Sequence, residues 1–144
     1  MKLEFKHDFV SKTIVRKMNF ADYGAELEDN TILPIVFERK SCSDLYGTLG
    51  KGNRRFKREL ERCIEANFKM YLIIEGTFTK ISKGHRYSKL KPHTLLRILG
   101  TMWDKYEKNF QPIFCRDRTE MQNVILWRFF SAAKEHIKNT KKKR

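Results

Sequence analysis

Cysteine and histidine are scarce in this chain of 144 residues, and their spacing excludes the sites that they most often build. The three cysteines, Cys42, Cys63 and Cys115, lie far apart in the sequence and form no C-x-x-C motif. The four histidines are scattered, with no pair at the spacing of a zinc finger or of a helical zinc site. We therefore expect free thiols in a reducing compartment, and neither a disulfide framework nor a structural zinc site.

Long apolar stretches are also missing. No apolar run approaches the roughly 20 residues that a membrane-spanning helix needs. The N-terminal segment MKLEFKHDF carries charges where a secretory signal peptide has its apolar region. These absences predict a soluble, intracellular protein of the cytoplasm that has no membrane partner.

Acidic residues are few compared with basic ones. The chain has 17 Asp and Glu against 31 Lys and Arg, which gives a formal net charge of +14. This excess favours a polyanionic partner, because Lys and Arg that neutralise phosphates release condensed counterions. The length is that of one domain, and a hydrophobic content of 40% is compatible with a core.

Apolar segments in the second half of the chain alternate between strand and helix patterns. Residues 70–75 form a continuous apolar run, which is typical of a strand buried on both faces of a parallel sheet. A second short strand is expected at 112–115, and a basic loop at 84–92. Helices are expected at 41–49, 54–68, 93–107 and 119–138, with Ser41 or Ser43 capping the first and Thr119 the last. The order predicts an α/β domain whose helices cover both faces of a mixed sheet.

The first part of the chain is predicted to be extended. A strand is predicted at residues 13–18 and a turn at 19–23. Residues 24–29 and 32–40 read as the two arms of a hairpin around a turn at 28–31. The folded domain is expected to span residues 1–138, and residues 139–144 to form a basic disordered tail.

The end of the second arm carries residues that suit phosphodiester chemistry. Side chains alternate along a strand, so Glu38 and Lys40 share one face and Arg39 takes the other. A carboxylate can ligate Mg²⁺, and a lysine can orient water and stabilise charge on a phosphate. Asp22, at the preceding turn, is the candidate for a second metal ligand. Asp44 would either neutralise Arg39 or hold residues of the site in place without contacting the metal.

A charged triplet such as Glu38-Arg39-Lys40 is often only a solvated surface. Two features favour a site here: the triplet follows the buried-strand pattern Ile35-Val36-Phe37, and an aspartate lies upstream at a turn. The hypothesis of a site requires that Asp22, Glu38 and Lys40 converge within a few ångströms in the folded chain.

The same residues resemble a known family. The segments that carry the likeness are Ala21-Asp22, Glu38-Arg39-Lys40-Ser41-Cys42-Ser43-Asp44, Leu45-Tyr46-Gly47-Thr48-Leu49, Arg55-Phe56, Tyr71-Leu72-Ile73-Ile74-Glu75-Gly76, Ile113-Phe114-Cys115 and Arg128-Phe129-Phe130. They resemble the XPF-type nucleases, whose motif is Gly-Asp, a variable gap and then Glu-Arg-Lys-x-x-x-Asp. The likeness covers nearly the whole chain and is greatest to the single-domain versions of phages and mobile elements.

This resemblance implies a restriction-endonuclease-like fold and an endonuclease that depends on Mg²⁺ or Mn²⁺. Its DNA substrate would be branched or flap-like. By the resemblance, Asp22 and Glu38 would hold the metal and Lys40 would serve the attacking water. Arg39 and Asp44 would form a structural or catalytic ion pair. Arg55 would match an arginine near the site, and Glu75 is at most an outer group.

The chain also departs from the family pattern. Ala21 stands where the family has glycine, and the first strand, with its Asp-x-Arg-Glu motif, is expected to be missing. The helix-hairpin-helix pair that follows the nuclease domain in many relatives is also expected to be missing. These departures keep a second hypothesis open, in which the chain is a catalytically inactive, nuclease-like DNA-binding subunit that acts with a partner. A third hypothesis is a basic RNA- or anion-binding protein with an accidental triplet.

Two groups of basic residues are candidate DNA-binding surfaces. One lies on the helix expected at 54–68, and the other lies in the loop after the buried strand. Their members are Arg54, Arg55, Lys57, Arg58, Arg62, Lys83, Arg86 and Lys89. We expect them to contact phosphates rather than bases.

The last predicted helix is apolar more than halfway round. Its apolar residues include Val124, Ile125, Trp127, Phe129 and Phe130. Such a helix either is deeply buried or packs on a partner as well. Because relatives dimerise through their nuclease domains, the resemblance favours a homodimer through this C-terminal helix, with burial in the core as the alternative.

Overall fold

The computed structural model describes Leu3, Val10 and residues 18–142, so the strand predicted at 13–18 lies largely outside the described residues. Three parallel strands form a sheet in the order β1-β2-β3. The elements are β1 (Ile35–Ser41), α1 (Cys42–Leu49), α2 (Asn53–Glu65), β2 (Lys69–Glu75), α3 (Phe78–Ser82), α4 (Pro92–Lys105), β3 (Phe110–Cys115) and α5 (Arg118–Lys142). This order confirms the predicted α/β class with helices flanking a sheet.

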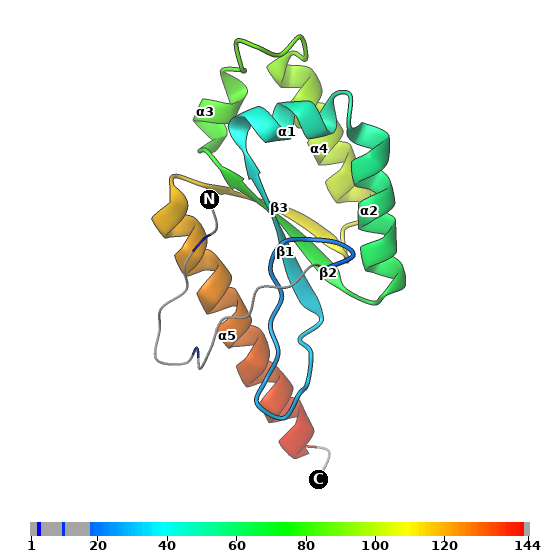
Figure 1. Cartoon of the computed structure of the whole chain (residues 1–144), viewed down its shortest axis with the longest axis vertical. Helices are drawn as coiled ribbons and strands as arrows, with labels where there is room; N and C mark the ends of the chain where they lie inside the picture. The colour runs from blue at the N-terminus through cyan, green and yellow to red at the C-terminus, as the bar shows by residue number, and fades with distance from the viewer. Residues whose placement is uncertain (1–2, 4–9, 11–17, 143–144) are drawn as a thin grey trace.

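The sheet lies between two helical layers (Figure 1). Helices α1, α2 and α4 enclose one core with β-strand residues such as Val36, Leu72 and Ile74. Helix α5 encloses the second core with Phe37, Ile73 and others from the opposite face. The central strand β2 is buried on both faces, as its continuous apolar run predicted.

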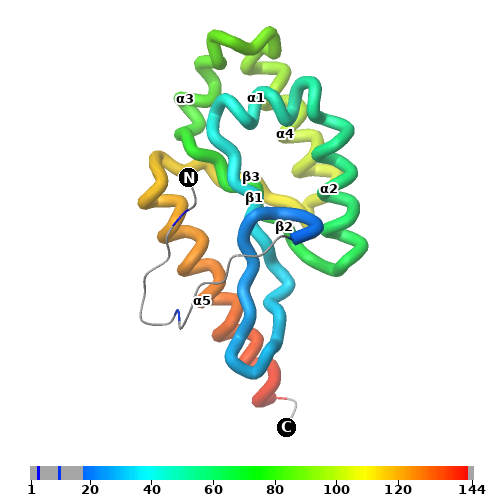
Figure 2. Tube along the Cα trace, in the orientation of Figure 1, coloured from blue at the N-terminus to red at the C-terminus, as the bar shows by residue number. Residues whose placement is uncertain are grey.

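The chain before β1 follows the hairpin prediction in outline without forming regular strands. Residues 18–34 leave the edge of β1 as a long loop and return to it (Figure 2). Isolated antiparallel bridges join Tyr23 to Phe37 and Glu26 to Ile32. Asn30, at the tip, has a positive φ of 69°, which suits its place in the predicted turn. The loop contributes the only antiparallel pairing among the described residues, beside an otherwise parallel sheet.

Helix ends follow local capping chemistry. Ser41 caps α1 as predicted, because its Oγ accepts the backbone N–H of Asp44 at 3.1 Å. The prediction that Thr119 caps the last helix was wrong. Asp117 takes that role through Oδ1, which accepts the N–H of Glu120 at 2.9 Å. Helix α2 ends before residue 68 because the chain turns at Asn67, whose φ is 65°. The short helix α3 was not predicted.

The length and composition of the helices test two further expectations. Helix α5 remains helical to Lys142, into the segment where the sequence predicted a tail. None of the helices in the described part of the chain is long and apolar enough to cross a membrane.

All three cysteines are free. Burial raises the pKa of the Cys63 thiol to about 12 and that of Cys115 to about 11. Both groups therefore remain protonated near neutral pH and act as small apolar core residues.

Candidate active site

Strand β1 places the two central residues of the motif on the helical face made by α1, α2 and α4. Val36 on this face is part of the core, so Glu38, two residues later, lies at the margin of the same core. Only 6% of Glu38 is exposed. Lys40 follows on the same face, with its Nζ 3.5 Å from Oε1 of Glu38. The strand thus brings a buried carboxylate and an ammonium together at its carboxyl end.

Asp22 reaches this site from the turn that lies along the free edge of β1. Its backbone N–H donates to the carbonyl of Phe37 at 2.8 Å. Its side-chain Oδ2 accepts the N–H of Arg39 at 2.8 Å. The carboxylate therefore occupies the hydrogen-bonding position that a neighbouring strand would otherwise fill, and its negative charge acts on Glu38. Through its bond to Arg39, Asp22 lies beside the strand segment that carries Glu38 and Lys40, which agrees with the hypothesis of a site.

A third carboxylate, Glu59 of α2, completes the cluster and was not predicted. Its side chain is hydrogen-bonded to the carboxyl group of Glu38. Its Oε1 also accepts the backbone N–H of Ala21 at 3.0 Å. Glu59 therefore fixes the residue that precedes Asp22. A sequence signal existed: Glu59 adjoins the apolar stripe of Phe56 and Leu60, where an acid on a basic helix turns towards the protein.

Electrostatics in this cluster are dominated by burial. Loss of hydration, the hydrogen bond that the protonated carboxyl group donates to Glu59 and the charges of Asp22 and Glu59 together raise the pKa of Glu38 to about 9. The ammonium of Lys40 opposes them and lowers the pKa of Glu38, but it does not offset burial. The carboxyl group of Glu38 therefore retains its proton at neutral pH, and a cation that bound there would displace this proton.

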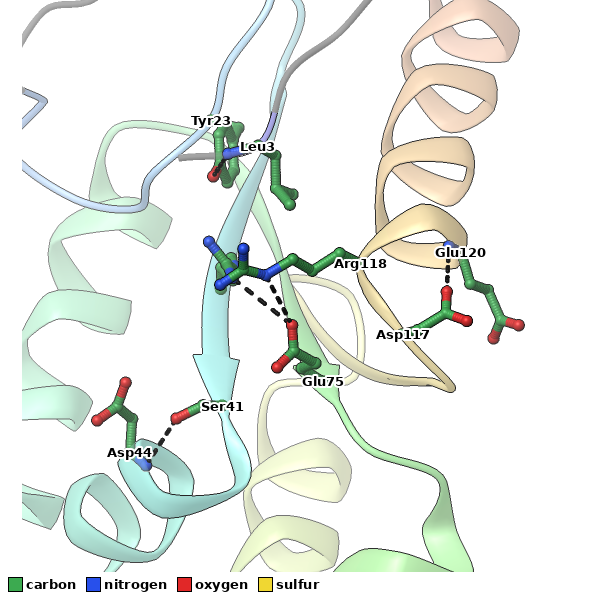
Figure 3. A network of polar contacts seen from close by, with 9 residues as sticks. Leu3, Tyr23, Ser41, Asp44, Glu75, Asp117, Arg118 and Glu120 are labelled. Atoms are coloured by element: carbon green, nitrogen blue, oxygen red, sulfur yellow. Dashed lines mark hydrogen bonds and ion pairs between the residues drawn. The ribbon is translucent and has the colours of Figure 1, made fainter. Parts of the chain in front are cut away.

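Arg39 belongs to a different network on the opposite face of the sheet. Its guanidinium lies 3.6 Å from Oε1 of Glu75, at the end of β2. Arg118 of α5 donates to the same oxygen at 3.3 Å (Figure 3). The resemblance suggested Glu75 as an outer group of the site. In the structure, Glu75 at the end of β2 connects β1 and α5 on the face of the sheet opposite the site. The network anchors the strand end that carries Lys40.

The remaining motif residue and the candidate DNA-binding residues lie around this edge. Asp44 is in the first turn of α1, where its N–H completes the Ser41 cap (Figure 3). The basic side chains proposed for DNA binding are all exposed, on α2 or on the connection between α3 and α4. They are Arg54, Arg55, Lys57, Arg58, Arg62, Lys83, Arg86 and Lys89. The structure therefore leaves each of them accessible to a phosphate.

The donor set suits Mg²⁺ or Mn²⁺ in part. The described residues contain no group of three or more His, Cys, Asp or Glu side chains already arranged around a metal position. Mg²⁺ commonly binds through one or two carboxylates and keeps several waters, with substrate phosphates as further ligands. Asp22 and Glu38 are the two carboxylates that could meet this requirement, because the charge of Asp22 acts on Glu38, which pairs with Lys40.

Comparison with protein families matches residues 2–126 to the ERCC4 domain. The chain belongs to the ERCC4 domain family. The match includes every residue of the site, from Asp22 to Glu59, and it confirms the predicted XPF-type nuclease domain. No curated protein matches the chain.

Solved structures support the same fold. XPF from Aeropyrum pernix is 20% identical, with a TM-score of 0.51 over 65% of this chain and 42% of that one. XPF from Aeropyrum pernix in complex with DNA is 21% identical, with a TM-score of 0.54 over 74% of this chain and 47% of that one. The chain thus spans less than half the length of these structures, and the likeness concerns the fold of the ERCC4 domain.

Proposed function

We propose that this ERCC4 domain is an endonuclease that depends on Mg²⁺ or Mn²⁺ and hydrolyses branched or flap-like DNA. The observation that carries the proposal is the pairing of Lys40 with the buried Glu38 at the carboxyl end of β1, with Asp22 bound to the intervening Arg39 backbone. The motif of the family, the net charge of +14 and the likeness to a structure that holds DNA agree with it.

Each residue has a role that follows from its position. Asp22 and Glu38 hold the cation, which when bound supplies charge that stabilises the phosphate in the transition state. Lys40 donates to the attacking water or to a phosphate oxygen from a distance set by Glu38. The water forms a new bond to phosphorus while one ester P–O bond breaks, and the leaving oxygen takes up a proton. Arg39 keeps the strand end in place through Glu75.

Basic side chains on α2 would track the DNA backbone. Glu59 faces the site, and Arg55 and Arg62 are four residues before and three residues after it on the same helix. Residues at these spacings share one helical face. Arg55 and Arg62 therefore flank the carboxylates, where they can bind phosphates next to the cleaved bond.

A second candidate function is that of an inactive, DNA-binding subunit with a nuclease fold. The observation that favours it is the absence, in the described residues, of three ready-made metal ligands. Such a subunit would bind branched DNA through the same basic surfaces and leave cleavage to a partner.

Nicking assays with labelled flap, fork and fully paired DNA would separate the two functions. With Mg²⁺ or Mn²⁺ present, we expect the wild type to nick the branched substrates. Asp22→Ala and Lys40→Ala should each lower the rate by at least about a hundredfold, because both groups act at the reacting phosphate. Asp104→Ala and Lys108→Ala are matched controls, since both residues are exposed at the opposite end of the sheet.

Metal binding can be tested without cleavage. A cation that binds only the folded state raises the melting temperature. We expect Mg²⁺ to raise it for the wild type and for Asp104→Ala, but not for Asp22→Ala. DNA binding with neither nicking nor a metal-induced shift would instead support the inactive subunit.

The extent of the domain and its assembly remain part of the proposal. We take residues 1–138 as the nuclease domain, although α5 continues to Lys142. Trp127 on α5 is 53% exposed although it is large and apolar. We propose that this helix forms a homodimer contact.

A further inference from the structure

The connection between β2 and α4 carries an exposed aromatic residue within a strongly basic segment. Residues 76–103 contain no Asp or Glu. The basic residues in this stretch are Lys80, Lys83, Arg86, Lys89, Lys91 and Arg97. Tyr87 lies among them and is 77% exposed, the highest fraction of any large apolar side chain described. An aromatic ring surrounded by cations is the composition of a surface that binds single-stranded nucleic acid.

Hydrogen bonds hold Tyr87 at the tip of a defined turn. The N–H of Ser88 donates to the carbonyl of His85 at 2.9 Å, so Arg86 and Tyr87 are the two central residues of a four-residue turn. The N–H of Leu90 donates to Oγ of Ser88 at 3.1 Å, and Leu90 packs on the core. The turn is thus tied to the folded body directly after its tip.

Ring contacts tie the same turn to the core from the other side. The ring centroids of His85 and Tyr87 are 5.6 Å apart, and those of His85 and Tyr46 are 6.3 Å apart. Tyr46 is buried, and its hydroxyl donates to the carbonyl of Ile81 at 2.7 Å. His85 therefore connects the exposed ring to a fixed one.

Arg86 restricts the ring further. Its guanidinium carbon lies 4.6 Å from the centroid of Tyr87, and its guanidinium also donates to the hydroxyl of Tyr87. A ring that is already ordered loses less entropy when a ligand stacks on it. Because 77% of Tyr87 is still exposed, Arg86 leaves room for such a ligand.

The turn lies at the same end of the sheet as the carboxylate cluster. It follows α3, which begins shortly after β2 ends, and β1 delivers Lys40 and α1 at that end too. Figure 1 shows α1, α3 and the connection from α3 to α4 gathered there. One DNA strand could therefore contact both features.

We propose that Tyr87, with Arg86 and His85 beside it, is a stacking site for an unpaired base of the DNA whose backbone reaches the active site. This inference rests on the proposed function. Bases inside a duplex have both faces covered by their neighbours, so away from the ends of the DNA an exposed ring can stack only on an unpaired base. Lys83 and Lys89, on either side of the turn, would bind the adjoining phosphates.

Binding without metal tests the inference independently of cleavage. The probes are a flap DNA with 2-aminopurine in its single-stranded arm and a fully paired duplex of the same length. Loss of a base–aromatic stack costs about 1–3 kcal/mol, or about fivefold to 150-fold in affinity. We expect Tyr87→Ala to weaken flap binding by that factor and to remove the 2-aminopurine fluorescence change that the wild type causes. Duplex affinity should change by less than about twofold.

Two control variants make the result specific. Tyr87→Phe keeps the ring and should bind the flap within about twofold of the wild type. Trp103→Ala removes an exposed aromatic near the far end of α4, roughly 16 Å along the helix from Pro92, and should leave flap binding unchanged. Unchanged flap binding by Tyr87→Ala, or an equal loss for flap and duplex, would overturn the inference. Failure of the wild type to nick DNA, with ring-dependent flap binding retained, would count against the proposed cleavage alone.

Discussion

At the scale of single residues, the buried carboxyl group of Glu38 lowers the stability of the folded chain when it is ionised. Its pKa is raised to about 9 from an ordinary value of 4.5. The unfolded chain therefore releases this proton more easily than the folded one. Below pH 4.5 this group should have no effect on the free energy of unfolding. Between pH 4.5 and pH 9 it should lower that free energy progressively as the pH rises, and above pH 9 the loss should be constant and largest.

Glu38→Gln tests this assignment, because glutamine keeps the shape and does not ionise. In EDTA at pH 8, we expect the variant to be more stable than the wild type by about 1–2 kcal/mol, as is common when a strained functional group is replaced. At pH 5 the difference should be smaller. Urea unfolding at both pH values measures it. Glu107→Gln, which changes an exposed acid at the opposite end of the sheet, is the control. Parallel pH profiles for the wild type and Glu38→Gln would contradict the raised pKa.

Ala21, next to Asp22, has a strained backbone conformation. Its φ of 64° lies in the left-handed region, which glycine adopts at lower cost. Glu59 and Phe37 nevertheless hold this turn in place through hydrogen bonds to Ala21 and Asp22. The strain explains why the pattern of the family has glycine here.

Ala21→Gly should therefore stabilise the domain by about 0.5–1 kcal/mol, because relief of the left-handed conformation outweighs the added entropy of the unfolded chain. Ala25→Gly, in the same loop but without a positive φ, should destabilise it by about 0.4–1 kcal/mol. Thermal unfolding of the two variants compares them directly. Equal losses in both would show that Ala21 is not strained.

At the scale of elements, helix α2 joins the carboxylate cluster to a basic surface. Glu59 turns towards Ala21 and Glu38, while Arg55 and Arg62 on the same face remain exposed. In the proposed function, one helix would thus present an acid to the metal and cations to the DNA on either side. Phosphates are the same in every sequence, so this surface should contribute affinity without sequence preference.

Arg55→Ala and Arg62→Ala should each weaken DNA binding to a similar degree for different base sequences. Each should also flatten the dependence of log K on log salt concentration by about one unit. Lys108→Ala, which removes one exposed charge at the amino end of β3, should leave that slope nearly unchanged. Fluorescence anisotropy at several salt concentrations gives the slopes. A loss that depends on base sequence would mean that α2 reads bases instead.

At the scale of the whole molecule, the parallel sheet separates the carboxylate cluster on one face from helix α5 on the other. The even-numbered motif residues of β1 face the helices α1 and α2, where the carboxylates gather. Arg39 faces α5, where it pairs with Glu75 beside Arg118. The outer side of α5 carries Trp127 and Ile137, which are 53% and 44% exposed. Assembly through α5 would leave the active face open to DNA.

Sedimentation, which measures the oligomeric state in solution, tests the proposed homodimer. We expect the wild type to show a concentration-dependent dimer in the micromolar range. Trp127→Lys should be monomeric because a charge replaces an apolar contact at the centre of the helix. Trp103→Lys, on α4, is the matched control and should still dimerise. A monomeric wild type up to about 100 μM would leave α5 a helix that serves the core alone.

Much of the architecture follows from local patterns in the sequence. The apolar run of β2, the Ser41 cap of α1 and the stripe of α2 are set by neighbouring residues, so periodicity and capping rules predict them. The alternation of β1 likewise predicts that Glu38 and Lys40 share a face. The cap of α5 was misassigned because Asp117 and Thr119 are both good capping residues, and only the path of the chain selects Asp117.

The sequence by itself determined the family motif, the basic charge and the pairing of Glu38 with Lys40, because each depends on residue identity or on spacing along one strand. Tertiary structure alone decided that Glu59 joins the cluster and that Arg39 pairs with Glu75. Both contacts join elements whose relative positions depend on how the helices pack against the sheet, and no local spacing encodes that packing. It also decided that Glu38 is buried, and burial is the physical cause of its raised pKa.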